Sequence, residues 1–259
     1  MKYSRKPDEI KDTELKKAFE HAEADYPNEC CGVFTRSKGY IRCTNVHDDP
    51  TQSFAMKEWL SVAANIEDVI AIFHSHPNGL NCPTSVDMRY QIQTNLPWGI
   101  AVMNDSGYVN DCFFWGGNKT PQLIGREYRS GVNDCYSLIR DAYRAWYNIL
   151  LPEFPRDSNY WDRGETLYRE GFPQAGFYEI DIKDASAGDV LIGKVLSKKI
   201  INHGAVIVDE KHILHHATGT LSRRSDLTKW ARRLNICLRH SAFCGKIPPA
   251  PPNLGVSNV

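Results

Sequence analysis

The sequence predicts an α+β protein made of two domains. Three observations lead to this prediction. First, stretches with helical spacing of apolar residues are interspersed with short apolar, β-branched runs. Second, this pattern lapses into a polar segment with Gly, Asn and Pro near the middle of the chain, at residues 116–129. Third, 259 residues, of which 42% are apolar, are enough to form two ordinary domain cores.

Charge and composition argue against several classes of function. Lys plus Arg and Asp plus Glu both number 31, so the chain has no electrostatic footprint for nucleic acid or an anionic membrane. No apolar run reaches the length of a membrane-spanning helix, and the N-terminus lacks the apolar core of a signal peptide. We therefore expect synthesis in the cytoplasm. We also expect the eight cysteines, which include no Cys-x-x-Cys pair, to be reduced.

The elements of the first predicted domain, residues 1–117, follow from periodicity. Apolar residues at helical spacing predict a helix that Pro27 ends. A second helix is predicted over residues 57–67. The predicted strands cover residues 31–35, 40–46, 68–73, 100–103 and 108–115. Helices mixed with a largely antiparallel sheet predict an α+β domain.

The motif His-Ser-His-Pro that begins at His74 contains the first candidate site. His74 and His76 lie two residues apart at the carboxyl end of a predicted strand, so their imidazoles share one face. Asp87 adds a carboxylate in the first turn of a helix predicted to start at Thr84. Two histidines, one carboxylate and an open fourth position are the usual arrangement of a catalytic zinc.

A catalytic zinc site also needs a proton acceptor that is not a ligand, and Glu29 is the candidate. Cys82, in the loop beside the site, is a further candidate ligand. We predict that it does not bind metal, because His, His and Asp already complete the expected protein set. Each of these pieces alone also fits an ordinary strand with surface histidines next to an N-capping threonine. Their order and spacing together indicate a site.

The pattern Pro-x-Glu-x-x-Gly, His-x-His-Pro and Pro-Thr-x-x-Asp resembles the JAMM/MPN-type zinc isopeptidases in their bacterial and phage form. The likeness spans roughly residues 10–115. It implies a mixed sheet with helices, Glu29 as general acid/base, and Thr84 in the place of a serine that helps to bind the developing oxyanion. It also implies that Zn²⁺ is bound by His74, His76 and Asp87. Threonine for serine is a mild departure, because the hydroxyl is kept.

The second domain is predicted over residues 131–245, after a linker at residues 118–130. Cys135 begins a stretch of apolar residues on one helical face. A cysteine at the first turn of a helix feels the positive end of the macrodipole, which favours its thiolate. A lone cysteine there is more often a small buried apolar residue. A nucleophile therefore needs a partner base.

The partner base is predicted on a hairpin of two strands, residues 202–208 and 212–217. His215 follows His203 by twelve positions and can lie beside it across such a hairpin. Cysteine, histidine and an orienting third group form a thiol-peptidase triad. His216 is the alternative third group, and period-two geometry allows only one of these neighbours to face His203.

The motifs Asp-Cys, Gly-Asp-Val-Leu-Ile and His-Gly-Ala-Val-x-Val resemble the NlpC-type cysteine peptidases over about residues 127–245. The resemblance implies a papain-like α+β fold with Cys135 as nucleophile and His203 as base. It implies His215 as the third residue, and His216 remains a rival because one extra residue before the following alanine makes the alignment ambiguous.

After the cysteine, many NlpC-type members have Ser-Gly or Ser-Ser, whereas this chain has Tyr-Ser-Leu-Ile-Arg-Asp. That run, together with Leu-His-His before a Gly and a Leu-Ser, resembles the tail assembly protein K family of lambdoid siphophages, which joins a JAMM-type to an NlpC-type domain in this order. The resemblance implies a protein made in the host cytoplasm that acts from the virion tail tip at the host cell wall or periplasm.

The same resemblance suggests partners and substrates. The NlpC-type domain is expected to cut stem peptides of bacterial peptidoglycan at a D-glutamyl-diaminopimelate type of bond. Other tail tip proteins are expected partners, and a ubiquitin-like tail assembly protein is a candidate substrate of the zinc domain. Two alternatives stay open: an assembly component with occluded or inactive sites, and a cellular JAMM-type protease acting on a ubiquitin-like or sulfur-carrier protein.

Two further segments have no assigned chemistry. An aromatic-rich insert at residues 150–184 is predicted to be a helical lobe that packs on the peptidase core, or else a wall of the substrate groove or a docking face. Residues 246–259 form a Pro-rich tail, predicted to be disordered or to order on a partner.

Overall fold

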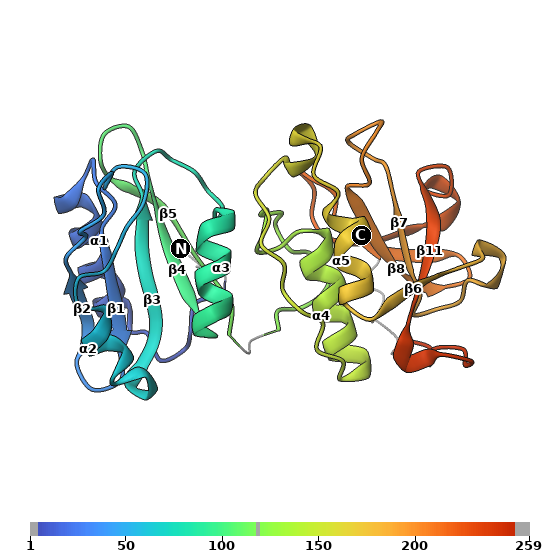
Figure 1. The fold of residues 1–259 in the computed structure, drawn as a ribbon, viewed down its shortest axis with the longest axis horizontal. Coiled ribbons are helices and arrows are strands. Elements are labelled where there is room, and N and C mark those ends of the chain that lie inside the picture. Colours follow the sequence, from blue (N-terminus) through green and yellow to red (C-terminus); the bar gives the residue numbers. More distant parts are fainter. Residues whose placement is uncertain (1–4, 118–119, 252–259) are drawn as a thin grey trace. The chain divides into compact units, whose positions relative to one another are not determined.

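The computed structural model describes residues 5–117 and 120–251. The chain divides into two compact units, Met1–Lys119 and Thr120–Val259, and each contains helices and its own β-sheet (Figure 1). The predicted α+β fold class is confirmed. Among the described residues, no helix is both long enough and apolar enough to span a membrane.

Unit 1 is built on a five-stranded sheet in the order β2-β1-β3-β4-β5. Neighbouring strands are antiparallel except for β3 and β4, which are parallel. The strands are β1 (Cys31–Thr35), β2 (Gly39–Cys43), β3 (Val69–His76), β4 (Trp98–Met103) and β5 (Val109–Trp115). The parallel pair is possible because a helix crosses between its two strands.

Two helices cover opposite sides of this sheet (Figure 1). Helix α1 (Asp12–Asp25) buries Leu15, Ala18 and Ala22 in one apolar core with Phe73 of β3. Helix α3 (Ser85–Thr94) lies on the other side and carries Asp87. Between them in sequence, the helix predicted at residues 57–67 is a short helix α2 (Trp59–Ala63) followed by a 3₁₀ turn η1 (Ile66–Asp68).

Strand β3 carries both histidines at its carboxyl end, as predicted. The apolar run at residues 68–73 continues as a strand to His76, and β4 pairs with it from Ile72 to His76. His74 and His76 are therefore fixed by the ladder of the sheet. Since alternate residues face alternate sides, Phe73 enters the α1 core while both histidines face the side of α3.

Unit 2 contains a six-stranded, wholly antiparallel sheet in the order β10-β9-β8-β7-β11-β6. The strands are β6 (Phe177–Ile180), β7 (Val190–Gly193), β8 (His203–Asp209), β9 (His212–His215), β10 (Arg223–Asp226) and β11 (Leu234–His240). The predicted hairpin between the two histidine-bearing strands is present as β8 and β9.

Helices α4 (Cys135–Tyr147) and α5 (Leu167–Gln174) lie on the same side of this sheet (Figure 1). Leu138 and Tyr143 of α4 and Phe172 of α5 share one core with Val206 of β8. Short 3₁₀ turns complete the unit: η2 (Tyr160–Arg163), η3 (Ile182–Asp184), η4 (Leu227–Lys229) and η5 (Ser241–Phe243).

Most of the segment predicted as linker packs within unit 2. Residues 118–119 lie outside the described residues, and residues 120–130 belong to unit 2. Arg126 is buried, and its guanidinium donates to Asp141 of α4 at 2.7 Å. The start of the predicted Pro-rich tail also contacts unit 2, because the hydroxyl of Tyr147 donates to the carbonyl of Pro249. Residues 252–259 of that predicted tail lie outside the described residues.

Candidate functional site

Unit 1 brings three predicted metal ligands together on the α3 side of its sheet. His74 Nε2 lies 3.3 Å from Asp87 Oδ1, His76 Nε2 lies 3.4 Å from Asp87 Oδ2, and the two Nε2 atoms are 3.2 Å apart. All three side chains are almost fully buried. They form a group whose donor atoms lie within 4.8 Å of one another, as one shared ion requires.

The spacing of these donors fits zinc. Ligand atoms about 2.0 to 2.1 Å from a tetrahedral zinc are separated from each other by about 3.3 Å. The three measured separations of 3.2, 3.3 and 3.4 Å match that value. Nitrogen and carboxylate oxygen are also the donor types that zinc accepts. Cys82 is buried nearby in sequence but is not part of this group.

Neighbouring groups orient the ligands. The Nδ1 of His76 lies 2.8 Å from the carbonyl oxygen of Leu80, so Nδ1 carries the proton and Nε2 keeps its lone pair for a metal. Thr84 is the N-cap of α3. Its hydroxyl accepts from the backbone N–H of Asp87 and lies 2.7 Å from Asp87 Oδ2, to which it donates.

The capping role of Thr84 bears on its predicted function. The Thr84 backbone N–H also donates to Asp87 Oδ2, at 2.7 Å, which completes a capping box. In this structure the Thr84 hydroxyl is therefore engaged with Asp87. Oxyanion binding stays a prediction for this residue, whereas its contact with a candidate ligand is direct.

Glu29 is buried next to the cluster, at the end of the segment before β1. Burial raises the pKa of its carboxyl to about 8, the nearby His76 lowers it, and Asp87 raises it further. A carboxyl with this pKa exchanges its proton near neutral pH, as a general acid/base must. The pKa of Asp87 shifts in the other direction. Burial raises it, but His74 and His76 together hold it far below the usual range.

A groove lies beside His74, His76 and Asp87, called the metal cluster below, on the same side of the sheet. Its volume is about 560 Å³, and Asp87 is part of its wall. The rest of the lining is mostly apolar or aromatic, with Phe54, Met56, Trp59, Ile72, Tyr90 and Trp98 among its members. An extended peptide with apolar side chains fits such a surface.

The second site starts at the N-terminus of α4. Asp134 caps this helix by accepting from the backbone N–H of Ser137 at 2.8 Å, and Cys135 is the first helical residue, as predicted. The Cys135 side chain is buried, with 8% of the residue exposed. The cavity at the thiol has a volume of only about 40 Å³.

The predicted base and its partner meet across the β8–β9 hairpin. His203 Nε2 lies 3.3 Å from His215 Nδ1, and His215 Nε2 lies 2.9 Å from Ser225 Oγ. Trp230 stacks on the His203 ring at 5.4 Å between centroids. His216 faces elsewhere, toward the carbonyl of Thr220. The geometry therefore favours His215 over its rival as the residue that orients His203.

The thiol and the base are not hydrogen-bonded to each other within the described residues. Cys135 instead lies against the backbone of Gly204, the residue after His203, and against the hydroxyl of Tyr168 at 2.8 Å. The predicted preference for thiolate is wrong for this conformation. Burial raises the pKa of Cys135 to about 11 and the adjacent Asp134 adds to the shift, whereas Tyr168 and the backbone of Gly204 lower it.

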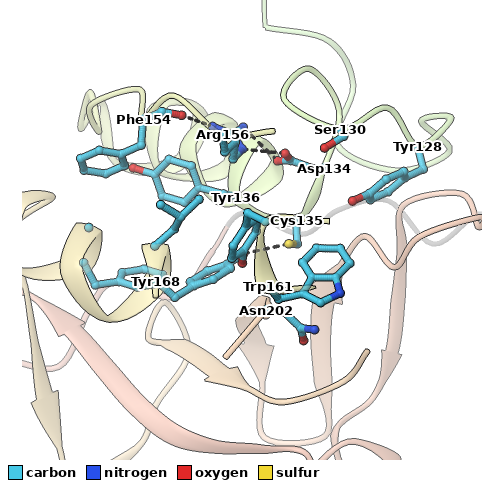
Figure 2. A pocket seen from close by; sticks show the side chains of 14 residues that line it. Tyr128, Ser130, Asp134, Cys135, Tyr136, Phe154, Arg156, Trp161, Tyr168 and Asn202 are labelled. Atoms are coloured by element: carbon cyan, nitrogen blue, oxygen red, sulfur yellow. Dashed lines mark hydrogen bonds and ion pairs between the residues drawn. The ribbon is translucent and has the colours of Figure 1, made fainter. Parts of the chain in front are cut away.

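Two side chains that the sequence did not assign to the site come from the insert. Arg156 donates to both carboxylate oxygens of Asp134, at 2.7 and 3.1 Å (Figure 2). It also donates to Ser137 Oγ. Burial would raise the pKa of Asp134, but Arg156 holds it well below its usual range. Tyr168 lies on α5 with its hydroxyl aimed at the sulfur. The only sequence signal for either residue was the aromatic richness of the insert.

The two units correspond to two known domain types. Residues 13–115 match the family of prokaryotic homologs of the JAB domain, and residues 110–239 match the NlpC/P60 family. The chain is therefore a two-domain protein that joins a JAB-like domain to an NlpC/P60 domain, in the predicted order.

Similar proteins narrow this class to one family. The chain is 35% identical over 188 residues to tail tip assembly protein K of Escherichia phage lambda, covering 72% of this chain and 89% of the relative. It is 31% identical over 216 residues to tail tip assembly protein K of Escherichia phage N15, covering 79% and 84%. The chain belongs to the tail tip assembly protein K family.

One solved structure has a low overall similarity to this chain. The solution structure of protein DSY2949 from Desulfitobacterium hafniense is 22% identical, covers 35% of this chain and 70% of that chain, and has a TM-score of 0.29.

Proposed function

We propose that this chain is a phage tail tip protein with two peptidase domains. The NlpC/P60 domain would cleave stem peptides of peptidoglycan, at a D-glutamyl-diaminopimelate type of bond, during penetration of the cell wall. The JAB-like domain would hydrolyse a peptide or isopeptide bond with zinc. One observation carries the proposal: a member of this family contains both the side chains of a zinc site and those of a thiol-peptidase triad. The first set is His74, His76 and Asp87, and the second is Cys135, His203 and His215.

The thiol chemistry follows from the residues around α4. The Cys135 sulfur would attack the scissile carbonyl after passing its proton to His203, which later protonates the leaving amine. His215 would keep the imidazole oriented through its contact with His203 Nε2, and Ser225 would hold His215 in turn. This leaves His203 Nδ1 as the nitrogen for the thiol proton.

The zinc chemistry follows from β3 and α3. His74, His76 and Asp87 would hold the ion, which supplies Lewis acidity and a water acidified toward neutrality. Glu29 would move a proton at its carboxyl, with a pKa of about 8 suited to the task. The apolar groove next to Asp87 would hold an extended segment of the substrate. A ubiquitin-like tail assembly partner is our proposed source of that segment.

Digestion of purified peptidoglycan tests the proposal. Wild type, Cys135→Ala and His74→Ala would be incubated with the wall, and released peptides analysed by mass. We expect release by wild type and His74→Ala, and none by Cys135→Ala. The two variants are matched controls for each other, because each disables one unit. Failure of folded wild type to release any peptide would refute wall hydrolysis.

A second function has one observation in its favour. The small cavity at Cys135 and the burial of its sulfur fit an assembly component whose thiol site is occluded. This reading expects tails to be lost when the gene is deleted and to form normally with Cys135→Ala, in the absence of any wall digestion. If the peptidase activity is instead required for assembly, tails should be missing both in the deletion and in Cys135→Ala.

A further inference from the structure

The thiol of Cys135 has a hydrogen-bonding partner outside the cysteine and histidine set. The hydroxyl of Tyr168 lies 2.8 Å from Cys135 Sγ, and either group can be the donor in the resting state (Figure 2). Tyr168 belongs to α5, within the aromatic insert, more than thirty residues after the cysteine. The insert therefore reaches the reacting atom itself.

The approach of Tyr168 to the thiol is built into its surroundings. Its ring stacks on Phe172, one turn along α5, with 5.2 Å between centroids and 26° between planes. It also lies against Gly204, where a Cβ would come within 3.2 Å of the tyrosine ring and 2.9 Å of Ile139 Cδ1. A glycine next to His203 therefore leaves room for the ring that carries the hydroxyl to Cys135. Tyr168 itself is buried.

We propose that Tyr168 is a catalytic residue, which donates a hydrogen bond to the Cys135 thiolate during the thiol chemistry. When the S–H bond breaks and its proton forms an N–H bond on His203, the hydroxyl of Tyr168 keeps its own proton and turns it toward the negative sulfur. The inference rests on the proposed function of unit 2, because it describes how that nucleophile is made.

The environment of the sulfur explains why such a donor is needed. Burial and the neighbouring Asp134 raise the pKa of Cys135, whereas the hydroxyl of Tyr168 and the backbone of Gly204 lower it. A buried anion is stable only when donors face it. Tyr168 supplies the side-chain donor at that position, so its removal leaves the thiolate less supported.

The test measures the titration of the thiol without any substrate. The rate of alkylation of Cys135 by iodoacetamide would be followed by peptide mass analysis in the full chain, from pH 6 to about 12.5, a range that covers the wild-type pKa of about 11 and an upward shift of about one unit. Cys244, the exposed cysteine, is an internal reference in every sample. The variant is Tyr168→Phe, and the matched control is Tyr160→Phe. Tyr160 lines the same cavity, and its buried hydroxyl has no hydrogen-bond partner among the described residues.

In Tyr168→Phe we expect the inflection of the Cys135 profile to move up by about one pH unit, with about tenfold slower alkylation below it. The inflection of the Cys135 profile in Tyr160→Phe should equal that of wild type, and the alkylation rate of Cys244 should be the same in all variants. An unchanged inflection in folded Tyr168→Phe would overturn the proposal. Faster alkylation with an unchanged inflection would also overturn it, because this result would show that Tyr168 shields the thiol from the reagent and does not donate to it.

A second variant guards against failure of Tyr168→Phe to fold. Gly204→Ala places a methyl group 2.9 Å from Ile139 Cδ1 and 3.2 Å from the tyrosine ring, which must move slightly and so lengthens the contact between its hydroxyl and the sulfur. We expect a smaller upward shift of the inflection there too. Because alkylation needs no peptidase activity, a shifted inflection in a protein that digests no peptidoglycan would refute the wall-hydrolase function while leaving the role of Tyr168 intact.

Discussion

The metal cluster and the thiol site are organised in different ways. The three metal-binding candidates come from one strand and the helix that follows it, and their donor atoms already converge. The thiol site draws on α4, two strands and an insert, and its sulfur and base are not hydrogen-bonded to each other within the described residues.

This difference shows two ways to prepare a reactive group. In unit 1, buried ligands are aligned by the backbone, namely by the ladder between β3 and β4 and by the cap of helix α3. In unit 2, a buried thiol is held neutral and is contacted by side chains that arrive from a distant segment. We therefore expect the metal cluster to respond to single ligand changes, and the thiol site to respond to changes in the insert as well.

The largest effect is expected at the metal cluster. His74→Ala removes one of the three proposed protein ligands, so the zinc affinity of the purified chain should fall by more than about a hundredfold. This is a larger loss than removal of a residue that only hydrogen-bonds to a ligand typically causes. Metal content after dialysis and calorimetric titration would measure it. Cys82→Ala is the control and should bind zinc as wild type does. Wild-type affinity in His74→Ala would contradict the site.

The next effect tests the dependence of the thiol site on the insert. Arg156→Met leaves the buried carboxylate of Asp134 without its partner and should cost unit 2 about 3 to 5 kcal/mol of unfolding free energy. Denaturant unfolding would measure it. The matched control is Arg163→Met, since Arg163 lies in the same insert with 48% of its side chain exposed. Equal stability of the two variants would show that Asp134 does not need this partner.

Acid should weaken unit 2 through the histidine pair. Burial lowers the pKa of His203 to about 3 and that of His215 to about 4. Since an unfolded histidine titrates near about 6.5, the unfolded chain takes up protons first. Stability is thus complete above about pH 6.5 and should fall by a few kcal/mol as the pH drops toward about 4.

Unfolding curves of the chain at several pH values would check this dependence. His203→Gln should flatten it, because the variant removes a group that is held neutral. His47→Gln, at an exposed position in unit 1, should retain the wild-type pH dependence. A wild-type stability that is constant between pH 7 and 4 would show that the pair takes up protons as readily in the folded protein as in the unfolded chain.

The smallest effect concerns the cap next to the metal cluster. Thr84→Val removes the hydroxyl that contacts Asp87 and should cost about 1 kcal/mol of stability, with about tenfold weaker zinc binding. Thr84→Ser keeps the hydroxyl and should behave as wild type. Full zinc affinity together with a loss of peptide hydrolysis in Thr84→Val would instead support its predicted contact with the oxyanion.

The comparison also shows where sequence reasoning succeeds. The histidine spacing in β3 and the capping threonine before Asp87 are local patterns, so the group of His74, His76 and Asp87 was predictable residue by residue. Cys135 as the first residue of a helix was predictable for the same reason. The pairing of β3 with β4 was not, because it joins segments more than twenty residues apart in the chain.

The sequence by itself determined the α+β class, the two chemical units and most of their candidate residues, because strand alternation, helix capping and motif spacing act over a few residues. Only the tertiary structure decided that His215 faces His203, that residues 120–130 pack within unit 2, and that Arg156 and Tyr168 meet the cysteine helix. Those contacts join segments far apart in the chain, and burial, which sets the pKa of the thiol, exists only once these segments have packed.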